Sequence, residues 1–132
     1  MPIEYSIDHQ RRLVIAKGRG TLTDRDVFGY QREVWSQAAV AGYNELMDMS
    51  EVEHIALESV GRVVQLARVS AGMDGPSSGT KFAIVAPQDA AFGLGRMYQT
   101  YLGLEEQSTK QVAVFRSLPE ALKFLGVETP EA

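Results

Sequence analysis

The chain has 132 residues, of which 45% are apolar and 23% charged, and its 17 acidic and 13 basic side chains give a formal net charge of −4. This length and composition are typical of one globular domain, so we expect a single domain over residues 1–132. The negative charge disfavours nucleic acid as a partner, the lack of cysteine excludes disulfides, and no apolar run approaches the ~20 residues that span a bilayer, so we expect a cytoplasmic protein.

The first elements along the chain are expected to form an antiparallel hairpin. Ile3, Tyr5 and Ile7 alternate with polar residues, which predicts a strand with one buried face. Residues 8–11 have the composition of a turn, and residues 12–17 predict the second strand of the hairpin.

A helix is predicted to follow, because Thr23 and Asp26 have the spacing of a capping box. Gly42 is expected to end this helix, since glycine is favoured just after a helix C-terminus. A short apolar strand over residues 43–49 and a linker over 50–57 come next. The helix is expected to bury a stripe at helical spacing: Val27, Tyr30, Val34, Trp35 and Ala38.

A second helix is predicted from the apolar spacing of Val60, Val63, Val64 and Ala67. Residues 73–79 are rich in glycine and serine and predict a flexible loop. The strand predicted over 81–86 is apolar on both sides, which indicates a central position in the sheet.

The last predicted elements are a helix over residues 87–103, a strand over 111–115 and a final helix that Gly126 ends. Ser117 and Glu120 have the spacing of a capping box at the start of that final helix.

The expected element order is therefore β-β-α-β-α-β-α-β-α. Strands that alternate with helices favour parallel pairing through right-handed crossovers, with the first strand antiparallel at one edge. We predict an α/β fold with an open mixed sheet of about five strands and about four helices.

The motifs that suggest catalysis do not fit their predicted context. Residues 75–79 match the G-x-S-x-G pattern of serine hydrolases, but they lie between a helix and a strand, whereas that motif needs a strand-to-helix turn. Both histidines, His9 and His54, precede the serines, and neither belongs to a recognisable metal-binding motif. We therefore expect no enzyme activity, no catalytic residue, no metal and no cofactor.

One motif carries a family resemblance. Asp48, Ser50, Val52 and Ile55 match the Asp-Leu-Ser-x-Val-x-x-Ile signature that follows the third strand of STAS domains, and Met49 replaces the leucine. Together with the element order, this motif makes the sequence similar to the small bacterial STAS/SEC14 proteins of the SpoIIAA-like group. The resemblance implies a SpoIIAA-like fold that binds partners at the carboxyl edge of its sheet.

The resemblance also implies which residues bind. The linker positions expected to take part are Asp48, Ser50, His54, Glu58 and Ser59. Glu58 occupies the position of the serine that is phosphorylated in anti-sigma-factor antagonists, so the phosphorylation switch is not expected here. A structural alternative is that Glu58 stabilises the first turn of the following helix by its charge.

The SEC14 side of the resemblance implies an apolar ligand between sheet and helix. The residues expected to form an apolar ligand or interface surface are Phe82, Ile84, Phe92, Arg96 and Tyr98. We also expect Phe82, Ile84, Val112, Val114, Leu13 and Ile15 to share one sheet face. A face left without helices would be covered by a second subunit or a ligand, whereas helices on both faces would make it ordinary core.

Two functions from different classes remain, and an enzyme whose site is assembled only in space is a third, less favoured interpretation. The first is a non-catalytic regulatory or protein-interaction module of STAS type, which we expect to be a homodimer. The alternative is a carrier or sensor of a small apolar, lipid-like ligand, similar to SEC14/CRAL-TRIO proteins. An enclosed apolar cavity would favour the carrier, and a flat apolar patch buried by another subunit would favour the interaction module.

Overall fold

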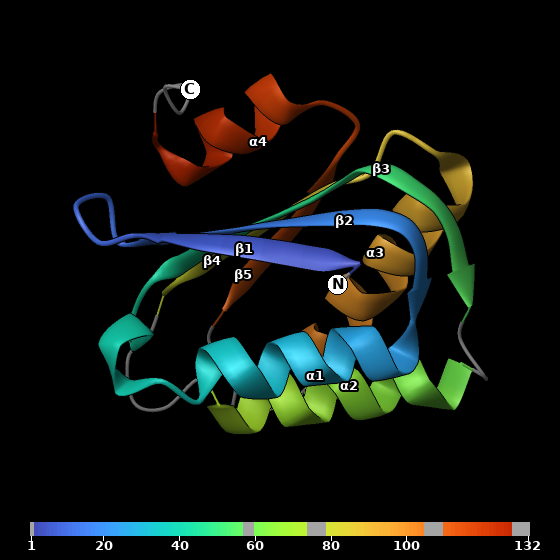
Figure 1. Cartoon of the computed structure of the whole chain (residues 1–132), viewed down its shortest axis with the longest axis horizontal. Helices are drawn as coiled ribbons and strands as arrows, with labels where there is room; N and C mark the ends of the chain where they lie inside the picture. Colours follow the sequence, from blue (N-terminus) through green and yellow to red (C-terminus); the bar gives the residue numbers. More distant parts are fainter. Residues whose placement is uncertain (1, 57–59, 74–78, 105–109, 128–132) are drawn as a thin grey trace.

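The computed structural model describes residues 2–56, 60–73, 79–104 and 110–127. Within these ranges, strands and helices alternate along the chain and form layers on the two sides of one sheet (Figure 1). The predicted order of strands and helices is confirmed, with one additional short 3-10 helix, η1 (Ala38–Val40).

The sheet has five strands, and their order in space is their order in the sequence, β1-β2-β3-β4-β5. Strands β1 and β2 pair antiparallel, and every later pair is parallel, as the sequence predicted. The strands are β1 (Ile3–Asp8), β2 (Leu13–Thr23), β3 (Asn44–Ala56), β4 (Lys81–Val85) and β5 (Gln111–Phe115).

Helices cover both faces of this sheet. Three of them pack on one face, α1 (Asp24–Trp35), α2 (Val60–Met73) and α3 (Asp89–Gly103), while α4 (Leu118–Leu125) packs on the other (Figure 1). Right-handed crossovers explain this arrangement, because a sheet that grows in one direction from β2 to β5 receives all its connecting helices on the same face.

Strands β2 and β3 are longer than the sequence predicted, so the prediction of a linker over residues 50–57 is wrong for the described part of that segment. The two strands stay paired as far as Thr23 and Ala56, with register shifts after Lys17 and after Gly20. In this extension, Val52 and Leu22 are buried on the sheet face under α1–α3. On β3, Glu51 and Glu53 flank Val52 and are exposed on the opposite face of the strand. Their charge gives this part of β3 the composition of a linker.

The predicted grouping of residues on one sheet face is partly wrong. Phe82, Ile84 and Val114 pack under α1–α3 in one core cluster. Leu13 and Ile15 instead belong to the second cluster, under α4. The register explains the difference, because Ile15 aligns with the row of Leu46 and Ala83, whereas Ile84 aligns with Met47.

Two capping predictions have different outcomes. At α1 the capping box is present, since the Asp26 amide donates to Thr23 Oγ1 at 3.2 Å and the Thr23 amide donates to Asp26 Oδ2 at 2.9 Å. At α4 the Ser117 hydroxyl donates to Glu120 Oε1 at 2.8 Å and caps no backbone group, so that capping box is not formed. The first helix also ends at Trp35, well before Gly42.

No helix in the described ranges is long and apolar enough to cross a membrane. The G-x-S-x-G stretch lies almost wholly outside those ranges, and only Gly79 of it is described.

We predict that Gly18→Ala lowers the free energy of unfolding by about 1–3 kcal/mol, because the new methyl group overpacks the core. A Cβ at Gly18 would lie 2.9 Å from Val52 Cγ2 and 3.1 Å from Leu22 Cδ1. A valine cannot easily turn away, since its χ1 angle is stiff. Urea denaturation measures the loss.

Gly29→Ala is the matched control. Gly29 lies in α1, and a Cβ there would have no neighbour within 4 Å. This substitution should raise the free energy of unfolding by roughly 0.5–1 kcal/mol, because alanine favours a helix interior. Equal effects of the two substitutions would contradict the close packing of Gly18.

Candidate functional site

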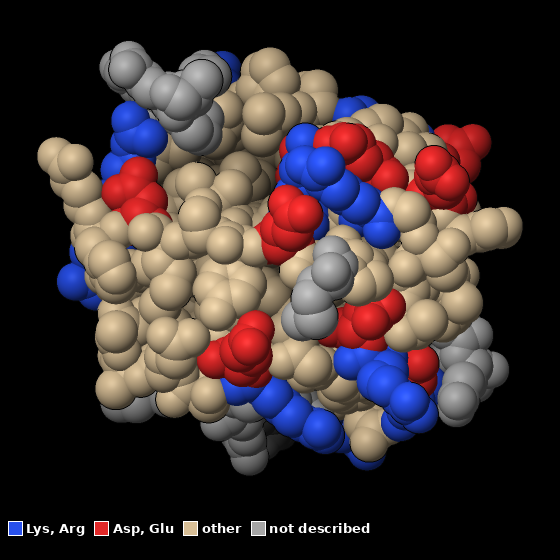
Figure 2. Space-filling view, viewed as in Figure 1, with Lys and Arg blue, Asp and Glu red and all other residues tan. Residues whose placement is uncertain are grey.

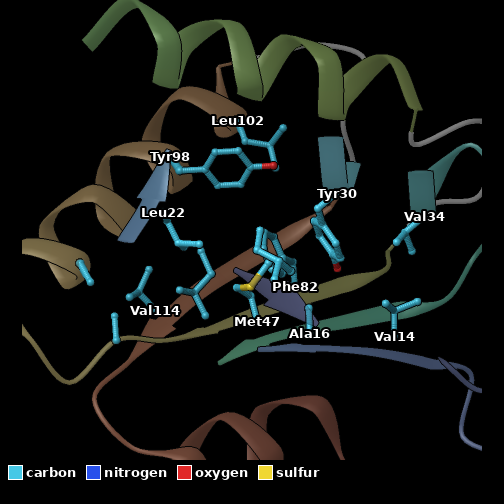
Figure 3. Packing of buried hydrophobic residues seen from close by; sticks show 14 of the residues in the cluster. Val14, Ala16, Leu22, Tyr30, Val34, Met47, Phe82, Tyr98, Leu102 and Val114 are labelled. Atoms are coloured by element: carbon cyan, nitrogen blue, oxygen red, sulfur yellow. The ribbon is translucent and has the colours of Figure 1, made fainter. Parts of the chain in front are cut away.

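A cavity of about 120 Å³ lies between α1, α2 and α3 and the sheet face on which these three helices pack. Its wall is almost entirely apolar, and Figure 3 shows Leu22, Tyr30 and Tyr98 in the layer between the helices and the sheet residues Met47 and Phe82. The apolar lining residues from the strands and their ends are Ile3, Leu22, Met47, Met49, Ile55, Phe82 and Ile84. Those from the helices are Val27, Phe28, Val63, Leu66, Ala91, Leu94 and Gly95.

The periodicity of the elements makes this wall. On α3, the lining residues Ala91, Leu94, Gly95 and Tyr98 recur at helical spacing and form one face. Gly95 allows α3 to approach the sheet closely, because a Cβ there would lie 3.1 Å from both methyl carbons of Val114. At Gly95, which lines the cavity, α3 therefore lies close to β5.

A buried carboxyl group lies in the cavity wall. Glu45 on β3 is 2% exposed, and the Tyr30 hydroxyl on α1 donates to its Oε2 at 2.6 Å. Burial raises the pKa of the Tyr30 phenol well above its usual range, and the Glu45 carboxyl group raises it further. The phenol therefore stays protonated at neutral pH and remains the hydrogen-bond donor of the pair.

An ion pair lies in the wall where α1 begins. Arg62 Nε on α2 donates to Asp24 Oδ2 at 2.5 Å, and Asp24 is buried. This hydrogen bond from Arg62 lowers the pKa of the Asp24 carboxyl group. The Arg62 guanidinium also donates to Gln65 Oε1 at 2.9 Å and lies 5.2 Å from the centre of the Phe28 ring.

Gln31 is a further polar side chain of the wall. It lies on α1 and is 6% exposed. Its carboxamide makes no hydrogen bond within the described ranges of the chain. The polar groups of the wall are thus the Tyr30–Glu45 pair, the Asp24–Arg62 pair, the Tyr98 hydroxyl and the Gln31 amide.

The structure brings Asp48 and Ser50 together at the carboxyl edge of the sheet. The Ser50 amide donates to Asp48 Oδ1 at 2.9 Å, and Gln88 Nε2 donates to the Ser50 carbonyl at 3.1 Å. His54 lies further along β3, is exposed and pairs with Thr21 on β2. Glu58 and Ser59 lie outside the described residues. The binding role of these positions stays a prediction.

The apolar set predicted for a ligand or interface divides into two groups. Phe82, Ile84 and Tyr98 line the cavity, and the Phe82 and Tyr98 rings contact each other edge-on with 5.8 Å between their centres. Phe92 is half-buried away from it and carries the Arg116 guanidinium 4.0 Å from its ring centre. Arg96 is exposed.

Sequence reasoning missed the polar residues of the cavity wall. Glu45 occupies a buried position of an apolar strand, and Gln31 lies at core spacing in α1. A polar residue at a position where the pattern demands an apolar one is the signal that points to such groups.

The surface charges balance locally. Arg11 pairs with Asp8 at 3.6 Å, Arg19 pairs with Glu4 at 3.9 Å, and Lys17 pairs with Glu51. Figure 2 shows acidic and basic side chains intermixed on the viewed face. In the described ranges, no group of three histidine, aspartate or glutamate side chains is placed to hold a metal ion.

No protein-family model matches the sequence, and no curated protein is significantly similar to it. A similar solved structure is that of an uncharacterised DUF3478-family protein from Shewanella loihica PV-4, described as having a SpoIIAA-like fold. The match covers 93% of each chain with a TM-score of 0.59 and 18% sequence identity. The predicted SpoIIAA-like fold is thereby confirmed, and a fold alone assigns no function.

We predict that Tyr30→Phe lowers the free energy of unfolding by about 1–3 kcal/mol, because the buried Glu45 carboxyl group loses a hydrogen-bond donor. Glu45→Gln in the Tyr30→Phe background should recover part of this loss, since a neutral amide is less costly to bury than a carboxylate. Urea denaturation of the two variants and the wild type measures both effects.

The same pair predicts a dependence on alkaline pH. The Tyr30 pKa is raised in the folded state, so the folded protein keeps this proton where the unfolded chain has lost it. The stability that this proton contributes is fully present below the ordinary tyrosine pKa of 10.0. It is lost as the pH rises toward the higher pKa of Tyr30 in the folded protein. The free energy of unfolding of wild type should therefore fall more steeply above that pH than that of Tyr30→Phe. Parallel pH profiles would contradict this assignment.

Proposed function

We propose that the protein is a non-catalytic binding module that holds a small apolar molecule between its sheet and α1–α3. The observation that carries this proposal is the cavity of about 120 Å³, with its nearly continuous apolar wall. Concave sites lined mainly by apolar side chains with a few polar groups are the usual sites of small-molecule binding, which supports a ligand here. Of the two functions that the sequence left open, this supports the carrier or sensor.

The volume limits the size of the ligand. An apolar cavity of about 150 Å³ in another protein stays dry and holds benzene or xenon, whereas drug-sized ligands need roughly 300–1,000 Å³. At about 120 Å³, the cavity fits a compact molecule of benzene-like size and does not fit a lipid chain. The lipid-like ligand considered from the sequence is therefore narrowed to a small, compact one.

The interaction module has less support. The expectation of a homodimer rested on helices that lie mainly on one side of the sheet and leave an apolar face or edge to cover, and α4 packs here on the second face over β3, β4 and β5. In the described ranges, the large apolar side chains that are exposed are Tyr5 on β1 and Leu104, which directly follows α3. Scattered exposed apolar residues are ordinary on a monomer surface and do not indicate an interface.

Catalysis has no support in the wall of the cavity. The Tyr30 hydroxyl binds Glu45, and Asp24 binds Arg62. Within each pair, the two side chains stabilise each other. The histidines lie outside the cavity wall, with His9 beside Tyr43 and His54 exposed on β3. A binding role with no chemical step accounts for the apolar wall.

We predict that benzene binds wild-type protein and that Ala91→Leu abolishes binding. Ala91 is 3% exposed and lines the cavity, so a leucine there fills the space that benzene would occupy. When free benzene is present at about ten times its Kd, its binding should raise the free energy of unfolding by about 1.4 kcal/mol through mass action. Thermal unfolding with and without benzene measures this effect, and NMR titration locates it.

Ala39→Leu is the matched control, because it adds the same atoms at an exposed position of η1. This variant should bind benzene as wild type does. If benzene perturbs no cavity residue of the wild type up to its solubility limit, the proposed function is wrong.

A further inference from the structure

Among the polar side chains that line the cavity, Gln31 is one whose hydrogen bonds the described part of the fold does not satisfy. Gln31 is 6% exposed and lines the cavity, and its carboxamide has no hydrogen bond within the described ranges. Its two polar atoms are also not fully enclosed, unlike Trp35 Nε1 and Gln99 Oε1, which are the enclosed and unsatisfied side-chain atoms of the described residues. The amide therefore still meets open space, and for a residue in this wall we infer that the space is the cavity.

The other polar groups of the wall already have partners. Tyr30 donates to Glu45, and Asp24 accepts from Arg62. An amide without a partner in apolar surroundings is unfavourable, and a ligand that supplies a partner removes that cost. Gln31 is thus the group in the wall that gains most from a hydrogen bond to a ligand.

We propose that Gln31 selects the ligand, which is a compact apolar molecule with one neutral hydrogen-bonding group such as a hydroxyl, a carbonyl or a ring nitrogen. This inference rests on the proposed function and names the ligand class of the same cavity. The group is neutral because an ionised one would lose its hydration among apolar side chains. The carboxamide both donates and accepts hydrogen bonds, so it can bind a ligand group that is either an acceptor or a donor.

Benzene and pyridine form a matched pair of probes, because they have the same size and differ in one ring atom that accepts a hydrogen bond. Their affinities are measured by NMR titration of wild type, Gln31→Leu and Gln37→Leu, at a pH where pyridine is uncharged. Leucine is close to glutamine in size and has no hydrogen-bonding group. Gln37 is exposed and binds the Glu33 carbonyl outside the cavity, so its variant is the control.

Gln31→Leu is expected to weaken pyridine binding about tenfold while benzene binds equally or more tightly, since only pyridine loses a hydrogen bond. Gln37→Leu should leave both affinities unchanged. Without any ligand, Gln31→Leu should also raise the midpoint of thermal unfolding, because it removes an unsatisfied buried amide.

The outcomes separate the two proposals. If Gln31→Leu changes the two affinities by the same factor, Gln31 does not select the ligand, although the cavity still binds apolar molecules. If Gln31→Leu instead lowers the unfolding midpoint, the amide is satisfied in the free protein and this inference fails. If neither probe binds wild type, the proposed function fails first.

Discussion

The structure depends on one constraint, which is the burial of a single sheet face under three helices. The sheet grows from β2 to β5 in one direction, so α1, α2 and α3 all pack on that face and α4 alone covers the other. The three helices and the sheet contribute apolar side chains to one core cluster, and the cavity lies between them. Any function of this interior follows from how those helices are spaced.

Polar groups inside such a layer must be matched or they destabilise the fold. Tyr30 and Glu45 satisfy this requirement between α1 and β3, and Arg62 and Asp24 satisfy it between α2 and α1. Each pair joins two elements that border the cavity, so the pairs hold the wall in place around an unfilled space. The Gln31 amide differs from them because no described residue completes its hydrogen bonds.

Much of the fold could be predicted from the sequence, because the local signals agree with the final packing. The capping box of Thr23 begins α1, and the apolar run over β4 marks its central position. The full length of β3 could not be predicted, because its exposed glutamates face solvent on one side of a two-stranded extension and give the segment the composition of a loop. The cavity could not be predicted either, because a void depends on how side chains from three helices meet. Its polar residues did leave a signal, Glu45 at a buried strand position.

The central claim is that the space under α1–α3 accepts a small apolar guest without rearrangement of the fold. A crystal structure of the protein under xenon pressure tests this directly, because xenon enters dry apolar cavities of this size. The account predicts a xenon atom within contact distance of Met47, Leu66 and Leu94, which line the cavity from β3, α2 and α3. A pressurised crystal with no xenon there, and with side chains filling the space, would contradict it.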